Sequence, residues 1–172
     1  GKLERHFYST SSCGVCGKSS IEAIQIHCPT KLPTTFSIAP NVIHALSERV
    51  QKEQMVFKHT GGLHAAAVFD TKGRLILWKE DIGRHNALDK VIGTQFFENQ
   101  TPMSDKILWL SSRVSFEMVQ KSIRAGISLV VAMGAASSLA VDLADKFNLT
   151  LIGFARNESF NIYSGVDRIK IQ

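Results

Sequence analysis

The sequence predicts an α/β fold, in the form of a three-layer α/β/α sandwich with a mixed sheet. In the second half of the chain, short apolar runs of strand character alternate with stretches of helical periodicity, which is typical of parallel strands joined by crossover helices. Ahead of this alternation, two strand-like runs are separated only by Thr71-Lys72-Gly73, which predicts an antiparallel hairpin. The chain has 172 residues, of which 44% are hydrophobic, so it is long enough to bury a core.

Two regions of different character are expected along the chain. Residues 1–37 begin with basic residues and continue with a Ser- and Gly-rich run that contains Cys13-Gly14-Val15-Cys16, a composition typical of a flexible lead-in with a two-cysteine loop. Residues 38–172 contain the periodic apolar pattern and are expected to form a single α/β domain.

The first helix and the hairpin have clear signals. Apolar residues recur at helical spacing after Pro40, which suits a first turn, so a helix is expected from Pro40 to about Gln54. The two strands of the hairpin are expected at Leu63–Asp70 and Arg74–Glu80. Gly73 stands in the turn, where the backbone requires a positive φ.

The remaining elements follow from alternating strand and helix patterns. In chain order we expect a helix from near Asn86 to Phe96, a strand Ile107–Ser111, a helix Ser115–Ala125 ended by Gly126, a strand Ser128–Ala132, a helix Ser137–Phe147, a strand Leu149–Phe154 and a short edge strand Phe160–Tyr163.

Charge and composition limit the kinds of partner. The net charge of +5 favours an anionic ligand. No apolar run approaches the roughly 18 residues that span a bilayer, so no membrane partner is expected. Aromatic residues make up 8% and do not interleave with the basic ones, which argues against nucleic acid. Three cysteines, two of them in an isolated C-x-x-C spacing, suit the reducing cytoplasm better than a secreted disulfide framework.

A ligand site is expected where strands of the parallel part end, because helix N-termini and free backbone N–H groups converge there. Arg84, Arg113 and Arg156 each stand just past a strand, and guanidinium groups there suit phosphate or carboxylate. His64 and His85 are the histidines placed to act on a ligand. The alternative is that the arginines are solvated loop charges and the histidines are structural. Asp81 and Asn86 fit a helix cap equally well.

The two cysteines of the lead-in leave several interpretations open. Cys13 and Cys16 would need His27 and Cys28 to complete a zinc site. Their Ser and Gly neighbours argue against a thioredoxin-like dithiol, which opens a helix. A nucleophilic thiol on a mobile arm and a pair of inert thiols are the other two interpretations.

Four runs of the chain together resemble the FdhD/NarQ family, the formate dehydrogenase accessory sulfurtransferases. They are residues 12–18 (SCGVCGK), 60–66 (TGGLHAA), 80–90 (EDIGRHNALDK) and 153–163 (GFARNESFNIY). Members of the family normally have a further N-terminal segment, which this chain is expected to lack. The run at 80–90 is the most specific of the four.

The resemblance implies a cytidine-deaminase-like fold without the deaminase zinc, and a function in cofactor maturation. Members are understood to take sulfur from a cysteine desulfurase as a cysteine persulfide. They pass it to the molybdenum or tungsten bis(molybdopterin guanine dinucleotide) cofactor, Mo-bisMGD, before that cofactor enters formate dehydrogenase. Two-fold assembly into a homodimer is also implied. A cofactor-binding chaperone without sulfur chemistry is the alternative function.

The resemblance also assigns roles to residues. Cys13 matches the persulfide position, and Cys16 would assist or resolve the persulfide. Mo-bisMGD is expected as a bound substrate, with no permanent metal. The residues expected to bind it are Phe154, Ala155, Arg156, Asn157, Glu158, Ser159 and Phe160 near the C-terminus, together with Gly61, Gly62, His64, Asp81, Arg84, His85 and Arg113 at the other strand ends.

Overall fold

The computed structural model describes residues 31–53, 61–156 and 159–170. In chain order they form helix α2 (Pro40–Glu53), strands β1 (His64–Asp70) and β2 (Leu75–Asp81), helix α4 (Arg84–Phe97), strand β3 (Lys106–Leu110), helix α5 (Phe116–Arg124), strand β4 (Leu129–Ala132), helix α6 (Ser138–Lys146), strands β5 (Thr150–Arg156) and β6 (Ser159–Ser164), and the short 3-10 helix η1 (Val166–Arg168). Each helix and strand expected from the sequence is present, with ends that differ by at most two residues.

The strands form one mixed sheet in the order β2-β1-β3-β4-β5-β6. The parallel part consists of β3, β4 and β5, as the alternating pattern predicted. The antiparallel part is larger than the hairpin alone, because β1 is antiparallel to both β2 and β3, and β6 is antiparallel to β5. The ends of β2, β3, β4 and β5 and the beginnings of β1 and β6 therefore share one edge of the sheet.

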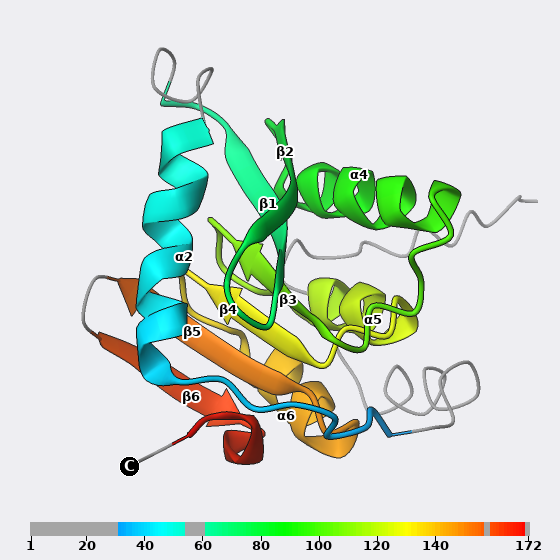
Figure 1. Cartoon of the computed structure of the whole chain (residues 1–172), viewed down its shortest axis with the longest axis vertical. Coiled ribbons are helices and arrows are strands. Elements are labelled where there is room, and N and C mark those ends of the chain that lie inside the picture. Colours follow the sequence, from blue (N-terminus) through cyan, green and yellow to red (C-terminus); the bar gives the residue numbers. More distant parts are fainter. Residues whose placement is uncertain (1–30, 54–60, 157–158, 171–172) are drawn as a thin grey trace, which may run out of the picture.

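Helices cover both faces of this sheet. Figure 1 shows α4, α5 and α6 on one side of the strands and α2 on the other. Side chains alternate along β3, so that Leu108 packs with the three-helix side and Ile107 and Trp109 pack with α2. The α2 side chains in this second cluster are Ile43, Leu46 and Val50, which explains their helical spacing. The predicted three-layer α/β/α sandwich is confirmed.

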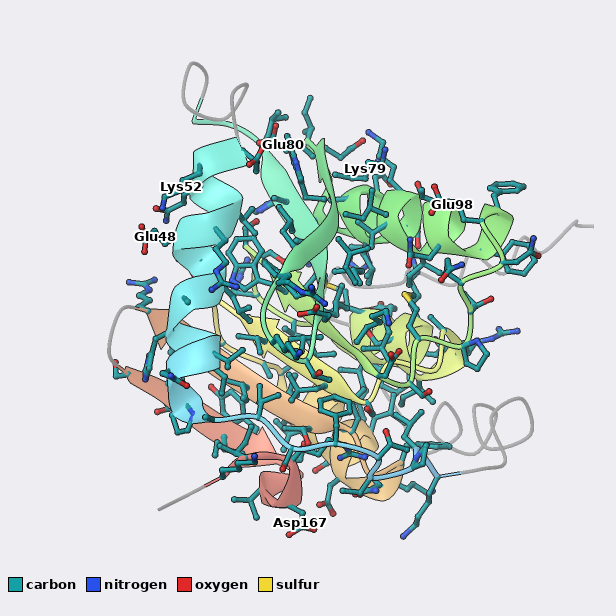
Figure 2. All side chains as sticks on the ribbon, viewed as in Figure 1. Glu48, Lys52, Lys79, Glu80, Glu98 and Asp167 are labelled. Atoms are coloured by element: carbon teal, nitrogen blue, oxygen red, sulfur yellow. The ribbon has the colours of Figure 1, made fainter. Side chains whose placement is uncertain are left out.

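The outer surface of α2 is polar, as expected for a helix that covers one face of a sheet. Glu48 and Lys52 form an ion pair of 2.9 Å one turn apart, and Figure 2 shows both labelled side chains on the side of α2 away from the strands. On the inner side, Trp109 donates a hydrogen bond from Nε1 to Oγ of Ser47 at 3.1 Å. This bond satisfies the indole of a tryptophan that is otherwise fully buried.

Two glycines lie in turns where the backbone of any other residue would be strained. Gly73 has φ +74° in the turn between β1 and β2, as predicted. Gly126 has φ +77° just after α5, and a Cβ there would lie 2.5 Å from Cβ of Pro102. Both positions therefore require the left-handed conformation that glycine adopts without a steric penalty.

Residues 31–37, which the sequence placed in the lead-in, are packed against the domain. The amide of Leu32 donates to the carbonyl of Phe147 at 2.9 Å, and Nδ2 of Asn148 donates back to the Leu32 carbonyl at 2.8 Å. Phe147 follows α6 and precedes β5, so this attachment lies at the sheet edge opposite the carboxyl ends of β3, β4 and β5. Within the described residues, no helix is both long and apolar enough to cross a membrane.

Candidate functional site

The topology brings the sequence-predicted binding segments to one edge of the sheet. Gly61, Gly62 and His64 stand at the start of β1, because that strand runs against its neighbours. The other described candidates follow β2 and β3 or lie at the facing ends of β5 and β6; they are Asp81, Arg84, His85, Arg113, Phe154, Ala155, Arg156, Ser159 and Phe160. Candidates separated by up to a hundred positions in the chain thus share one side of the molecule.

A cavity of about 270 Å³ opens among the loops that follow β2, β3 and β4. Two of the predicted residues, Arg84 and Arg113, line it. The other lining residues come from the starts of α5 and α6, and they are Val114, Ser115, Ala135, Ala136 and Ser137. Ser115 and Ser137 are the N-cap residues of those two helices. Two guanidinium groups and two helix N-termini therefore surround one hollow, an arrangement that favours an anion.

Backbone hydrogen bonds fix the two loops of this cavity to each other. The amide of Val114 donates to the carbonyl of Ala135 at 2.9 Å, and the amide of Ser137 donates to the carbonyl of Val114 at 3.0 Å. The hydroxyl of Ser137 accepts from the amide of Ala140, whereas the hydroxyl of Ser115 donates to Oε2 of Glu117 at 2.6 Å. The cavity wall is thus built from connected backbone rather than from independent loops.

Asp81 organises the turn that precedes Arg84. Its Oδ1 accepts from the amide of Gly83 at 2.9 Å and from Nδ2 of Asn86 at 3.1 Å, and its Oδ2 lies 2.5 Å from Nζ of Lys90. The hydrogen bond from Lys90, followed by those from Gly83 and Asn86, lowers the pKa of the Asp81 carboxyl to about 2. The carboxylate is therefore ionised and used within the turn, where it positions Arg84.

The sequence interpretation of Asp81 and Asn86 as a helix cap was wrong in its details. The N-cap of α4 is Gly83, without a side-chain cap, and Asn86 is the third residue of the helix. Asp81 bonds the amide of Gly83 instead of an amide in the first helical turn. The helix therefore starts two residues earlier than the apolar periodicity indicated.

The two candidate histidines lie beside the arginines, and the pKa of each is lowered, which favours the neutral imidazole. Burial, followed by the charges of Arg84 and Arg113, lowers the pKa of His64. Burial also lowers the pKa of His85, with Arg84 and Lys121 acting in the same direction and two carboxylates opposing them. Among the described residues, these histidines are neighbours of the cavity and are not part of its lining. A neutral imidazole there can accept a hydrogen bond, which a guanidinium cannot.

Phe154 has an unusual backbone near the end of β5. Its φ is +52° and the residue is 43% exposed, although aromatic residues prefer burial and avoid the left-handed region. Its amide donates to the carbonyl of Gly134 at 3.2 Å, which places it beside the loop that lines the cavity. A strained and exposed aromatic residue at a strand end indicates a contact surface for a ligand.

The neighbours of Phe154 differ in what they can contribute. Ala155 is 4% exposed and packs in the α2-side core, so only its backbone can reach a ligand. Arg156 and Ser159 are exposed and pair across β5 and β6. The ring of Phe160 lies 5.3 Å from the ring of His44 on α2. Asn157 and Glu158 lie outside the described residues.

Comparison with known proteins identifies the family. The sequence profile of the FdhD/NarQ family matches residues 2–170, which is nearly the entire chain. The chain belongs to the FdhD/NarQ family.

Curated relatives of this family member have the name "sulfur carrier protein FdhD". One from Streptomyces coelicolor is 45% identical over 172 residues, and one from Mycobacterium tuberculosis is 47% identical over 170 residues. The alignments cover 99% and 97% of this chain but 61% of each relative. The chain thus spans 61% of the length of these relatives.

A solved structure of similar fold comes from Desulfotalea psychrophila and is described as a formate dehydrogenase accessory protein. It matches with a TM-score of 0.75 and 25% sequence identity, and the match covers 89% of this chain and 61% of that one. Its fold agrees with the mixed sheet flanked by helices described above.

The cysteines on which the family resemblance depends are not among the described residues. Cys13 and Cys16 lie outside them, as do His27 and Cys28, the additional ligands of the alternative zinc site. Within the part of the chain that the structure describes, no group of three or more His, Cys, Asp or Glu side chains can hold a metal ion.

The sequence interpretation did not identify Ser115 and Ser137 as site residues. It used them only as helix starts, although each follows a strand of the parallel part. The signal that could have found them is a serine N-cap directly after each of two consecutive parallel strands, because such strands end side by side. His44 gave no signal, since its contact with Phe160 joins elements that are far apart in the sequence.

Proposed function

We propose that this chain is a sulfurtransferase that carries sulfur as a persulfide on Cys13 and transfers it to Mo-bisMGD bound at the carboxyl edge of the sheet. The names of the relatives support sulfur transport, and the description of the similar solved structure supports a role in formate dehydrogenase maturation. The observation that supports the binding half is the cavity between Arg84 and Arg113 at the N-termini of α5 and α6. A cysteine desulfurase is the proposed donor and formate dehydrogenase the proposed recipient.

The cavity suits a diphosphate group of this substrate. At about 270 Å³ it is smaller than the roughly 300–1,000 Å³ of pockets that enclose whole drug-sized ligands. It therefore holds an anionic part of a dinucleotide and leaves the rings outside. Each guanidinium offers paired donors to phosphate oxygens, and the two helix N-termini add backbone N–H groups.

Phe154 is the proposed platform for a purine or pterin ring next to this cavity. It lies beside the β4–α6 loop through its bond to Gly134, and its ring is partly exposed. Stacking of a base on an aromatic side chain contributes about 1–3 kcal/mol and depends little on the identity of the base. The combination of an anion pocket with an adjacent aromatic ring favours a nucleotide over a simple anion.

The proposed chemistry needs two cysteines. The Cys13 thiolate attacks the outer sulfur of the desulfurase persulfide, so that a new S–S bond forms on Cys13 and the desulfurase leaves as a thiolate. The Cys16 thiolate then attacks Cys13 Sγ, which forms a Cys13–Cys16 disulfide and releases the outer sulfur as sulfide to the metal. The two thiols supply the two electrons, and a cellular dithiol reduces the disulfide for the next cycle.

The chain length is compatible with delivery to the proposed site. Lys31, which directly precedes the attached residue Leu32, stands fifteen positions after Cys16. A fully extended segment of that length spans up to about 50 Å. The edge at which Leu32 is attached is separated from the carboxyl edge by the length of β5, which is about 23 Å for seven residues.

Intact-mass analysis after incubation with a cysteine desulfurase and L-cysteine tests the sulfur half. The wild-type chain should gain one sulfur atom, the Cys13→Ala variant should gain none, and Cys16→Ala should retain the added sulfur longer. Cys28→Ser is the matched control and should behave as wild type. An unchanged adduct on Cys13→Ala would remove that thiol from the mechanism.

Calorimetric titration with guanosine diphosphate tests the binding half. Arg84→Ala and Arg113→Ala should each weaken binding by about tenfold or more, since each removes a charged hydrogen-bond donor. Arg124→Ala, at the far end of α5, is the control and should leave the affinity unchanged. Equal affinities in all three variants would exclude the cavity as the nucleotide site.

The alternative of a cofactor-binding chaperone is supported by the same cavity, because the cavity requires no cysteine. Formate dehydrogenase maturation in cells distinguishes the two functions. A Cys13→Ala/Cys16→Ala double variant should abolish maturation if sulfur is carried and should preserve it if the cofactor is only escorted. Homodimer formation stays a prediction, which sedimentation of the full chain would test.

A further inference from the structure

Gly153, directly before Phe154, has no space for a side chain. A Cβ at this position would lie 2.5 Å from Cε2 of Tyr163 and 2.9 Å from the carbonyl oxygen of Gly134. Its φ is outside the left-handed region, so the backbone conformation alone would accept alanine. The requirement for glycine is therefore purely steric, and it comes from two neighbours on different elements.

One of these two neighbours, Gly134, also contacts Phe154. The Gly134 carbonyl that faces Gly153 also accepts the hydrogen bond from the Phe154 amide at 3.2 Å. Tyr163 of β6 packs against the core on the side of α4, α5 and α6, so its ring has a fixed support. Regular pairing of β5 with β6 is interrupted between Gly153 and Arg156, the interval that contains Phe154.

We infer that Gly153 and Tyr163 are positioning residues that hold Phe154 in its left-handed conformation and so set the aromatic surface that a purine stacks on. This inference rests on the proposed function and adds to it two residues that do not touch the ligand. Close packing of the Tyr163 ring on Gly153 keeps the β5 backbone against Gly134. A side chain at Gly153 would push β5 away and release the bond that fixes Phe154.

The inference separates two parts of ligand binding that can be measured independently. Inorganic diphosphate contacts only the cavity, whereas guanosine diphosphate also presents a purine to Phe154. The ratio of the two affinities therefore measures the contribution of the base. A substitution at Gly153 should alter this ratio, and a substitution at Arg113 should lower the affinity for both ligands.

Calorimetric titrations of the full chain with both ligands provide the test. Gly153→Ala should lower the affinity for guanosine diphosphate by about tenfold, the effect of one lost stacking contact. The affinity for diphosphate should stay within about twofold of wild type. Tyr163→Leu alone should give a smaller loss of the same kind. The Gly153→Ala/Tyr163→Leu double variant should recover part of the loss, because the shorter side chain makes space for the added Cβ.

Two controls test whether the effect on base binding depends on the position of the added methyl group. Gly93→Ala adds the same methyl group where, beyond the backbone of α4 itself, no atom of the described residues lies within 4 Å, and both affinities should stay unchanged. Retained binding of diphosphate shows in each variant that the cavity is folded. Two results would overturn the inference. In the first, Gly153→Ala or Tyr163→Leu weakens the binding of both ligands equally. In the second, Phe154→Ala reduces the ratio of the two affinities, but neither Gly153→Ala nor Tyr163→Leu does. If the wild-type chain bound neither ligand, the proposed function itself would fail.

Discussion

Nζ of Lys90, the seventh residue of α4, lies 2.5 Å from Oδ2 of Asp81 at the end of β2. The same ammonium group donates to the carbonyl of Glu80 at 3.1 Å, so it binds the last two residues of the strand together. The helix that begins with Arg84 is thereby fixed to the strand that precedes it. This contact connects the stability of the turn to the ionisation of one carboxyl.

Stability should therefore depend on pH through Asp81. Its pKa is lowered from 3.8 to about 2 in the folded chain, so the unfolded chain binds the proton first as the pH falls. The stabilisation is complete above about pH 4 and is lost between about pH 4 and pH 2. The difference in Tm between wild type and Asp81→Asn should be constant from pH 7 to pH 5 and should vanish near pH 2.

Asp105→Asn provides the control for this experiment, because Asp105 forms only a surface pair with adjacent Lys106. Its Tm should stay close to that of wild type at every pH. A Tm difference for Asp81→Asn that persisted unchanged at pH 2 would show that the loss comes from packing and not from the charge.

The strain at Phe154 predicts an inverted order of stability for two substitutions. In an ordinary strand, glycine is less stable than alanine by about 0.5–1 kcal/mol. At φ +52° the alanine Cβ has an unfavourable contact that glycine lacks, so Phe154→Gly should be more stable than Phe154→Ala by about 1 kcal/mol. Urea unfolding measures the difference. At Asn161, an exposed residue of β6 opposite Gly153, the usual order should hold.

Much of this fold was predictable because its signals are local. The apolar spacing after Pro40 predicted α2, and the Thr71-Lys72-Gly73 turn predicted both the hairpin and the positive φ of Gly73. The alternation after residue 100 predicted three parallel strands in chain order. Because strand ends follow from those elements, the shared edge of the candidate site was predictable as well.

The parts that could not be predicted depend on contacts between distant residues. The left-handed Phe154 lies where β5 meets Gly134, which is distant in the sequence, and its own sequence gives no turn signal. Arg168 is near the end of the chain and would ordinarily be exposed, yet it is completely buried. The role of Asp81 depended on where α4 begins, and helix ends are poorly defined by periodicity.

Removal of one arginine should change the titration of one histidine. Besides burial, Arg84 and Arg113 lower the pKa of His64, whereas the cations that lower the pKa of His85 are Arg84 and Lys121. Arg113→Gln should therefore raise the titration midpoint of His64 and leave that of His85 in place, while Arg84→Gln should raise both. Proton NMR of the imidazole Cε1–H signals measures each midpoint. A shift of His85 in Arg113→Gln would contradict the arrangement described for this edge.

The lowered pKa of these histidines also determines whether the folded chain gains or loses stability as the pH falls. The unfolded chain binds protons near pH 6.5, before the folded chain does, so the free energy of unfolding should fall as the pH decreases from 7. His64→Asn should reduce this slope between pH 7 and pH 5. An unchanged slope would show that His64 titrates normally in the folded protein.

Arg168 joins the segment before α2 to the C-terminal end of the fold. Its Nη1 donates to Oγ1 of Thr150 at 3.0 Å and its Nη2 donates to the carbonyl of Pro33 at 2.9 Å. Thr150 also donates to the carbonyl of Gly165, so it would keep one partner without the arginine, whereas the Pro33 carbonyl would lose the donor described here. Arg168→Met should therefore destabilise the chain by about 1–2 kcal/mol, the cost of a partly buried carbonyl that loses its charged donor.

Urea unfolding followed by the fluorescence of buried Trp109 measures this loss, and hydrogen exchange shows where it acts. Because Pro33 is adjacent to Leu32, the Leu32 amide should exchange faster in Arg168→Met, while the amides of β3 should change only as much as global stability does. Arg124→Met, an exposed change, should stay within about 0.5 kcal/mol of wild type. Wild-type stability with unaltered Leu32 exchange in Arg168→Met would mean that residues 31–38 are held by backbone bonds alone, such as the pair between Ile38 and the η1 segment.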